Sequence, residues 1–131
     1  MSTWFKVNKN LDNVDRLYIM EIVVGETTVY KVGKASGHSS KQRMLQIIGS
    51  YFDVYRITPV VKIVKDKEVK NVFEKETKCH HELVEWQFIP EKAFSGSTEL
   101  FLVEKEVVLE VYNKIVKDSE CSTEVGTKTH G

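Results

Sequence analysis

The feature that most constrains the fold is a pair of apolar runs separated by a short break that contains glycine. The first run, Leu17 to Val24, is rich in isoleucine and valine, and the second extends from Thr27 to Gly33. Between them stands Gly25-Glu26, which suits a tight turn. Runs of β-branched residues joined in this way are typical of a β-hairpin. We therefore expect two antiparallel strands in this part of the chain.

The segments after the hairpin predict a helix and then a third strand. Ser39 or Ser40 is a candidate helix cap, and apolar positions recur as far as Gly49, where we expect this helix to end. A third strand is predicted from Val54 to Val64. Pro59 within it indicates an edge position or a bulge, because proline cannot donate a hydrogen bond to a β-ladder.

Two further helices are predicted towards the C-terminus. Asp66 is a candidate cap for a helix that extends to about Trp86, with apolar positions at intervals of three and four residues. The last helix carries one apolar face, made of Val108, Val111, Tyr112 and Ile115. Residues 118–131 are polar and lack periodicity, so we expect a disordered tail there.

This order of elements predicts an α+β domain with a small three-stranded antiparallel sheet flanked by helices. We assign the domain to residues 1–117 and the tail to residues 118–131. A chain of 131 residues with 41% hydrophobic residues can bury one modest core, so a second, target-reading domain is not expected.

The sequence shows no signal for export or membrane insertion. The N-terminus lacks an apolar signal segment, and no apolar run approaches the roughly 18 residues that span a bilayer. We therefore expect a cytoplasmic protein without membrane contacts. Cys79 and Cys121 are far apart and should be reduced thiols. A zinc site from Cys79, His80 and His81 is not expected, because adjacent helical residues point in different directions.

Charge is balanced overall but uneven along the chain. The protein has 19 basic and 19 acidic residues, which argues against indiscriminate coating of nucleic acid. Residues 28–78 nevertheless hold eleven basic groups against five acidic ones. Such a local excess could face a phosphate backbone, although surface charge also clusters by chance. Lys31, Lys34 and Lys41 are the candidate nucleic-acid contacts in this segment.

Polar residues suited to phosphodiester chemistry occur in a fixed order on the predicted elements. They are Tyr18 in Leu17-Tyr18-Ile19, Tyr30 in Tyr30-Lys31-Val32-Gly33, Arg43, the pair Glu76 and His80, Glu99 in Gly96-Ser97-Thr98-Glu99-Leu100-Phe101, and Asn113. With the order of elements, this set resembles the GIY-YIG nuclease superfamily, particularly its compact phage and bacterial branch. The likeness covers most of residues 16–116.

The resemblance implies a division of roles in hydrolysis. Glu99 would anchor a single Mg²⁺ or Mn²⁺, a hard cation that prefers one or two carboxylates and keeps most of its waters. Arg43 would contact the scissile phosphate with its planar guanidinium. Tyr30 would orient or deprotonate the attacking water, with Tyr18 in support, provided that a nearby cation lowers the tyrosine pKa. Asn113 would complete the site.

Glu76 and His80 allow two interpretations. They are four residues apart on an apolar helical stripe, so they could satisfy each other as a buried structural pair. Alternatively, they could transfer protons or contact phosphate. The residues alone do not separate these roles.

The sequence therefore predicts a small divalent-metal-dependent endonuclease that acts on DNA in a bacterial or phage-infected cell. A homodimer or a protein partner would supply sequence preference. The alternative is a catalytically degenerate module of the same kind that binds nucleic acid or protein without cutting. A weaker third reading is a phage accessory factor that binds only proteins, which the balanced charge would suit.

Overall fold

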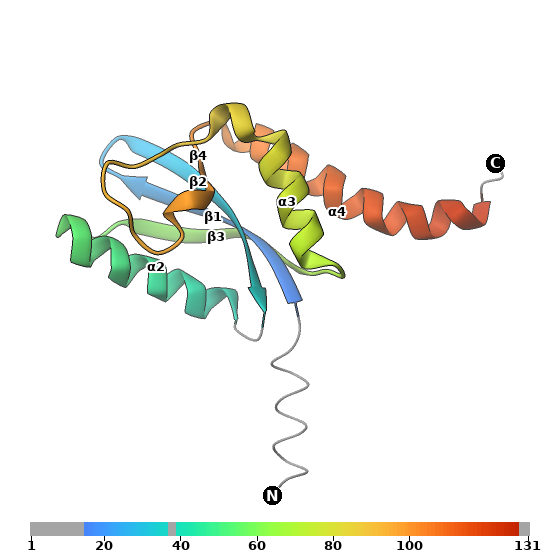
Figure 1. Ribbon diagram of the computed structural model, residues 1–131, viewed down its shortest axis with the longest axis horizontal. Coiled ribbons are helices and arrows are strands. Elements are labelled where there is room, and N and C mark those ends of the chain that lie inside the picture. Colours follow the sequence, from blue (N-terminus) through green and yellow to red (C-terminus); the bar gives the residue numbers. More distant parts are fainter. Residues whose placement is uncertain (1–14, 37–38, 129–131) are drawn as a thin grey trace, which may run out of the picture.

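The computed structural model describes residues 15–36 and 39–128, with side chains described as far as residue 117. Within these residues the chain forms an antiparallel sheet with helices on both faces (Figure 1). The predicted α+β class is therefore confirmed. Residues 1–14 of the predicted domain and residues 129–131 of the predicted tail lie outside the described residues.

The sheet has four strands, so the prediction of three was wrong. They are β1 (Asp15–Val24), β2 (Thr27–Ser36), β3 (Val60–Glu68) and β4 (Leu100–Phe101), in the spatial order β3-β1-β2-β4. The unexpected strand β4 pairs only with Tyr30 and Lys31 of β2. A strand of two residues has no alternation that a sequence pattern could reveal.

The predicted hairpin is present as β1 and β2. Gly25 in its turn has φ of 61°, a left-handed conformation that glycine adopts without steric cost. The register places Tyr18 opposite Gly33 and Glu21 opposite Tyr30. Because successive side chains of a strand point to opposite faces, Tyr18 and Tyr30 lie on different sides of the sheet.

Helix α2 (Ser40–Tyr55) begins where the sequence predicted but passes through Gly49. Ser39 forms a capping box with Gln42, and Arg56 ends the helix in a left-handed conformation with φ of 60°. A glycine inside a helix costs only about 1 kcal/mol. Stacking of Tyr51 on Tyr55 and their edge contacts with Phe94 favour the longer helix. The predicted start of the third strand at Val54 was therefore wrong.

Helix α3 (Val72–Glu82) is shorter than predicted, and Asp66 is not its cap. Asp66 lies in β3 and accepts a 2.7 Å hydrogen bond from Arg16 Nε of β1. This cross-strand ion pair favours an extended conformation at the position where the sequence suggested a helix start. Beyond α3, Trp86 belongs to the 3₁₀ helix η1 (Val84–Trp86) rather than to the same α-helix.

The sheet separates two apolar cores. One face packs against α3 and α4 (Lys105–Lys128), and the other packs against α2 and the segment before β4 (Figure 1). The predicted apolar face of the last helix is confirmed by burial of Val108, Tyr112 and Ile115. The backbone of α4 is helical to Lys128, beyond residue 117, where the sequence placed the end of the domain. Among the helices described, none is long and apolar enough to cross a membrane.

Candidate active site

The candidate site lies where β2 has no neighbouring strand. Along β2, strand β4 pairs with Tyr30 and Lys31, and among the described residues no strand continues this pairing towards Ser36. Helix α3 packs beside this part of β2, and the 3₁₀ helix η2 (Ser97–Glu99) leads directly into β4. Side chains from both faces of the sheet can therefore meet at its edge.

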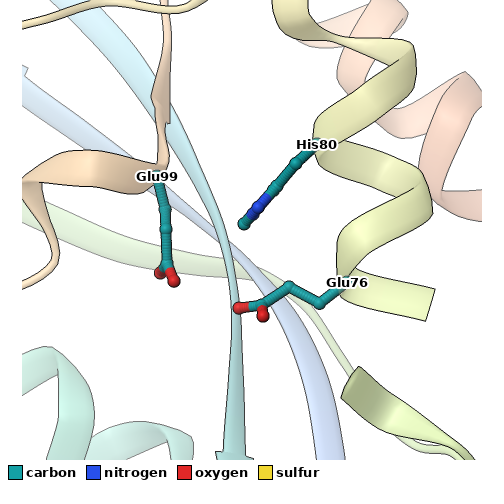
Figure 2. Close-up of side chains that lie close together, drawn as sticks. All are labelled: Glu76, His80 and Glu99. Atoms are coloured by element: carbon teal, nitrogen blue, oxygen red, sulfur yellow. The ribbon is translucent and has the colours of Figure 1, made fainter. Parts of the chain in front are cut away.

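Three side chains with metal-ligand atoms converge there. Glu76 and His80 of α3 and Glu99 of η2 each present one such atom within 4.8 Å of the other two. Figure 2 shows His80 and Glu76 reaching from α3 across β2 towards Glu99. The pair on α3 is therefore part of a three-residue cluster rather than an isolated structural clasp.

Glu76 is buried, and one of its carboxylate oxygens is unsatisfied. The side chain is 5% exposed, yet Oε2 has no hydrogen-bond partner. Burial raises the pKa of the Glu76 carboxyl, and the nearby negative charge of Glu99 raises it further, while His80 opposes this shift. A buried carboxylate oxygen without a hydrogen-bond donor is costly.

His80 is fixed by a backbone contact at the free edge of β2. Its Nε2 lies 2.7 Å from the carbonyl oxygen of Val32. A carbonyl oxygen can only accept a hydrogen bond, so Nε2 carries the proton and donates. In the neutral ring, Nδ1 then keeps its lone pair.

Lys31 is a central and fully buried member of the site. Its Nζ forms an ion pair with Glu99 Oε1 and lies 5.7 Å from the centroid of the Tyr18 ring. Burial lowers the pKa of Lys31, although the Glu99 carboxylate acts in the opposite direction. The sequence marked Lys31 only as a surface contact for nucleic acid.

Two glycines make room for this arrangement. A Cβ at Gly33 would lie 2.6 Å from the Tyr18 hydroxyl oxygen, and a Cβ at Gly96 would lie 2.9 Å from Cε of Lys31. Gly96 also has φ of 84°, which suits glycine. Both glycines belong to the sequence motifs described above, and at each position a neighbouring side chain leaves too little room for a Cβ.

Tyr18 and Arg43 complete the group from the α2 side of the sheet. The Tyr18 hydroxyl is buried and makes no hydrogen bond of ordinary geometry. Burial raises its pKa to about 12, and the neighbouring Arg43 guanidinium only partly offsets this shift. Arg43 is half-buried on α2, and its Nη1 donates a 2.6 Å hydrogen bond to Gln46 Oε1.

Tyr30 does not join the group. Its side chain belongs to the core on the α3 and α4 face, and its hydroxyl donates a 3.0 Å hydrogen bond to Glu21 Oε2. Burial raises the pKa of Tyr30 to about 12. The period of two along β2 could have revealed this, because Lys31, and not Tyr30, shares the face of Gly33 and of its partner Tyr18.

The remaining sequence candidates lie outside the cluster. Lys34 is half-buried, with its Nζ 5.9 Å from the centroid of the Phe73 ring. Lys41 is exposed in the first turn of α2. Asn113 is exposed on α4, and no hydrogen bond joins it to the described residues of the cluster. We use "edge site" below for the residues that do converge: Tyr18, Lys31, Arg43, Glu76, His80 and Glu99.

Comparison with known proteins places the chain in a family. The T5orf172 domain matches residues 15–116, which span β1 to the described side chains of α4 and include the whole edge site. The chain therefore belongs to the T5orf172 domain family. This is a phage-associated domain that is often found in nuclease-type proteins. No curated protein and no solved structure matches the chain.

Proposed function

We propose that the protein is a divalent-metal-dependent endonuclease of the GIY-YIG type that hydrolyses DNA phosphodiester bonds. The observation that carries the proposal is the edge site itself, which groups two carboxylates, an imidazole, a buried lysine, a tyrosine and an arginine. Membership of a domain family found in nuclease-type proteins supports the same reaction class.

The donor set of the edge site fits a divalent cation. Glu99 contributes carboxylate oxygens, and Oε2 of the buried Glu76 lacks a partner that a cation would supply. When bound, Mg²⁺ or Mn²⁺ supplies charge neutralisation at the phosphate and a more acidic water.

The cationic side chains of the edge site suit a phosphate. Arg43 would bind two phosphate oxygens with its planar guanidinium and stabilise the charge that develops on them. Its position on α2 brings this group beside Tyr18, on which the carboxylates of Glu76 and Glu99 also act. Lys34 and Lys41 would contact neighbouring phosphates of a strand held there.

Tyr18 and Lys31 would position the attacking water. With a pKa of about 12, Tyr18 stays protonated at neutral pH, so it would donate a hydrogen bond rather than act as a base. Lys31 would act on the water in the role that the resemblance implied for Tyr30, because Lys31 lies on the same side of the sheet as Tyr18. Its lowered pKa means that more of the amine is neutral at a given pH than in an exposed lysine, and only the neutral amine can accept a proton.

One observation favours the alternative of a module that binds without cutting. The Lys31 ammonium already neutralises Glu99, so the carboxylate has an internal cation as partner. In such a module the edge site would be a structural ion-pair network, and Arg43 with the nearby lysines would grip nucleic acid. A homodimer or protein partner would then define the biological target.

A plasmid-nicking assay tests the proposal. Purified protein is incubated with supercoiled plasmid and Mg²⁺ or Mn²⁺, with EDTA as the metal-free control. We expect nicking by the wild type and a loss on the order of 100-fold for Arg43→Ala, Glu99→Gln and Lys31→Met, because these residues respectively stabilise charge on the phosphate, hold the metal ion and position the attacking water.

Tyr30→Phe is the matched control, because its hydroxyl binds Glu21 on the other face of the sheet. It should nick close to the wild-type rate. Nicking at full rate by Glu99→Gln would contradict the proposal. Retardation of DNA in gels without metal and without nicking would favour the binding module.

A further inference from the structure

Of the two α3 side chains of the edge site, Glu76 offers an unsatisfied oxygen to the proposed ion, and His80 has no role so far in the proposed hydrolysis. Both nevertheless point at Glu99 from a separate element, and their ligand atoms approach it within 4.8 Å (Figure 2). This inference deepens the proposed function and rests on its metal dependence. It concerns which residues hold the ion and which ions they select.

The unsatisfied oxygen of Glu76 is the first reason to assign a ligand role. Glu76 is only 5% exposed, so water cannot readily donate a hydrogen bond to Oε2. No hydrogen-bond donor among the described residues satisfies this atom, and the groups around Glu76 are the Glu99 carboxylate, the His80 ring and the Lys31 and Lys34 ammonium groups, whose charges favour its ionised form. An oxygen held among further ligand atoms and without a donor is what a cation site requires.

The contact of His80 with Val32 is the second reason. Histidines that bind metals usually donate their other ring N–H to a carboxylate or a backbone carbonyl, which fixes the tautomer and the ring orientation. His80 makes such a bond from Nε2 to the Val32 carbonyl oxygen, 2.7 Å away. This carbonyl is available because β4 does not extend along β2 past Lys31.

We propose that Glu76, His80 and Glu99 together form a divalent-metal site whose imidazole ligand selects Mn²⁺ or Co²⁺ over Mg²⁺. Mg²⁺ prefers oxygen ligands and retains its waters, whereas the affinity of a site with a nitrogen ligand rises along the first-row ions from Mn²⁺ to Co²⁺. The site combines two carboxylates with one neutral nitrogen and leaves further coordination positions to water or phosphate. The Lys31 ammonium occupies Oε1 of Glu99, so the ion would use the remaining oxygen of that carboxylate.

Isothermal titration of the full-length, tag-free protein with MnCl₂, CoCl₂ and MgCl₂ tests this site without DNA. We expect one site for Mn²⁺ and Co²⁺ that binds at least about tenfold more tightly than Mg²⁺, following the order of ligand affinities. His80→Asn and Glu76→Gln should each weaken Mn²⁺ binding by at least roughly tenfold. Loss of a residue that only supports a metal ligand already costs about that much, and these two would be ligands themselves. Bound Co²⁺ should give visible absorption bands that change in His80→Asn.

The controls are side chains of the same type on the same helix. His81→Asn and Glu74→Gln replace exposed neighbours on α3 and should bind Mn²⁺ like the wild type. Circular dichroism establishes that each variant is folded. Glu76→Gln is preferred to Glu76→Ala because glutamine keeps the size of the buried side chain.

Equal affinity for Mn²⁺ and Mg²⁺, or unchanged Mn²⁺ binding by His80→Asn, would overturn the assignment and leave the pair as a structural clasp. The result is separable from that of the nicking assay. A protein that binds Mn²⁺ as described but does not nick DNA retains the site and loses the proposed reaction. A protein that nicks with Mg²⁺ and gives the same Mn²⁺ affinity in His80→Asn retains the reaction and loses the site.

Discussion

At the residue scale, the hydroxyl of Tyr18 determines which residue can stand opposite it. Tyr18 and Gly33 are paired across β1 and β2, and the phenol lies over the glycine. A Cβ at Gly33 would approach the Tyr18 hydroxyl oxygen to 2.6 Å, a distance at which the buried ring would have to move. Glycine is therefore required here by a neighbour on another strand, although its own backbone is ordinary strand.

Gly33→Ala should lower the free energy of unfolding by about 1–3 kcal/mol, the usual cost of overpacking a close-packed interior. Gly49→Ala is the matched control, because no atom lies within 4 Å of a Cβ built there. Gly49 is inside α2, so alanine should stabilise the protein by about 1 kcal/mol. Urea denaturation of both variants measures the difference, and equal effects of the same sign would contradict the steric argument.

At the element scale, helix α4 is attached to the sheet by a buried polar contact as well as by apolar packing. Tyr112 is fully buried, and its hydroxyl donates a 2.7 Å hydrogen bond to the Leu17 carbonyl oxygen of β1. Val108 and Ile115 pack on either side of it along the same helical face. The hydrogen bond fixes where α4 lies on the sheet, whereas apolar packing alone would tolerate sliding.

Tyr112→Phe should lower the free energy of unfolding by about 1–3 kcal/mol, because it removes a buried hydrogen bond and leaves the Leu17 carbonyl oxygen without this donor. Tyr55→Phe is the control, since its hydroxyl contacts Lys92 at an exposed position where water can replace the bond. Urea denaturation followed by circular dichroism measures both. A smaller loss for Tyr112→Phe than for Tyr55→Phe would count against the contact as an anchor.

At the scale of the whole molecule, burial of weak acids makes the free energy of unfolding depend on pH in the alkaline range. Burial raises the pKa of Tyr18, Tyr30 and Cys79 to about 12 in each case. In the unfolded chain these groups ionise near 9 to 10. Between those values the unfolded state has lost protons that the folded state keeps, so the stability that these groups contribute declines as pH rises.

The urea midpoint of the wild type should therefore fall between pH 8 and pH 10.5. Lys31 acts in the opposite direction, because its lowered pKa makes the folded state release its proton first, but it is one group against these three and against Tyr51 and Tyr112, whose pKa burial also raises. Denaturation curves at several pH values measure the trend. A midpoint that rises over this range would show that the three acids are not protected in the folded protein.

The order of most helices and strands along the chain, and several site residues, could be predicted from the sequence because they depend on local patterns. Alternating β-branched residues predicted the hairpin, and an apolar face predicted the position of the last helix. Boundaries were less accurate: α2 continues through Gly49, and Asp66 belongs to a strand because Arg16 pairs with it from β1. Contacts between distant segments outweighed the local signals for turns and caps.

The sequence by itself determined the α+β class and the presence of Tyr18, Arg43, Glu76, His80 and Glu99 as polar residues on defined elements. Only the tertiary structure decided which of them meet. It placed Lys31 instead of Tyr30 beside Tyr18, because the register of β1 and β2 fixes which side chains share a face. It also brought α3 against Glu99, because the two-residue strand β4 leaves the edge of β2 open and lets His80 bind the Val32 carbonyl oxygen there.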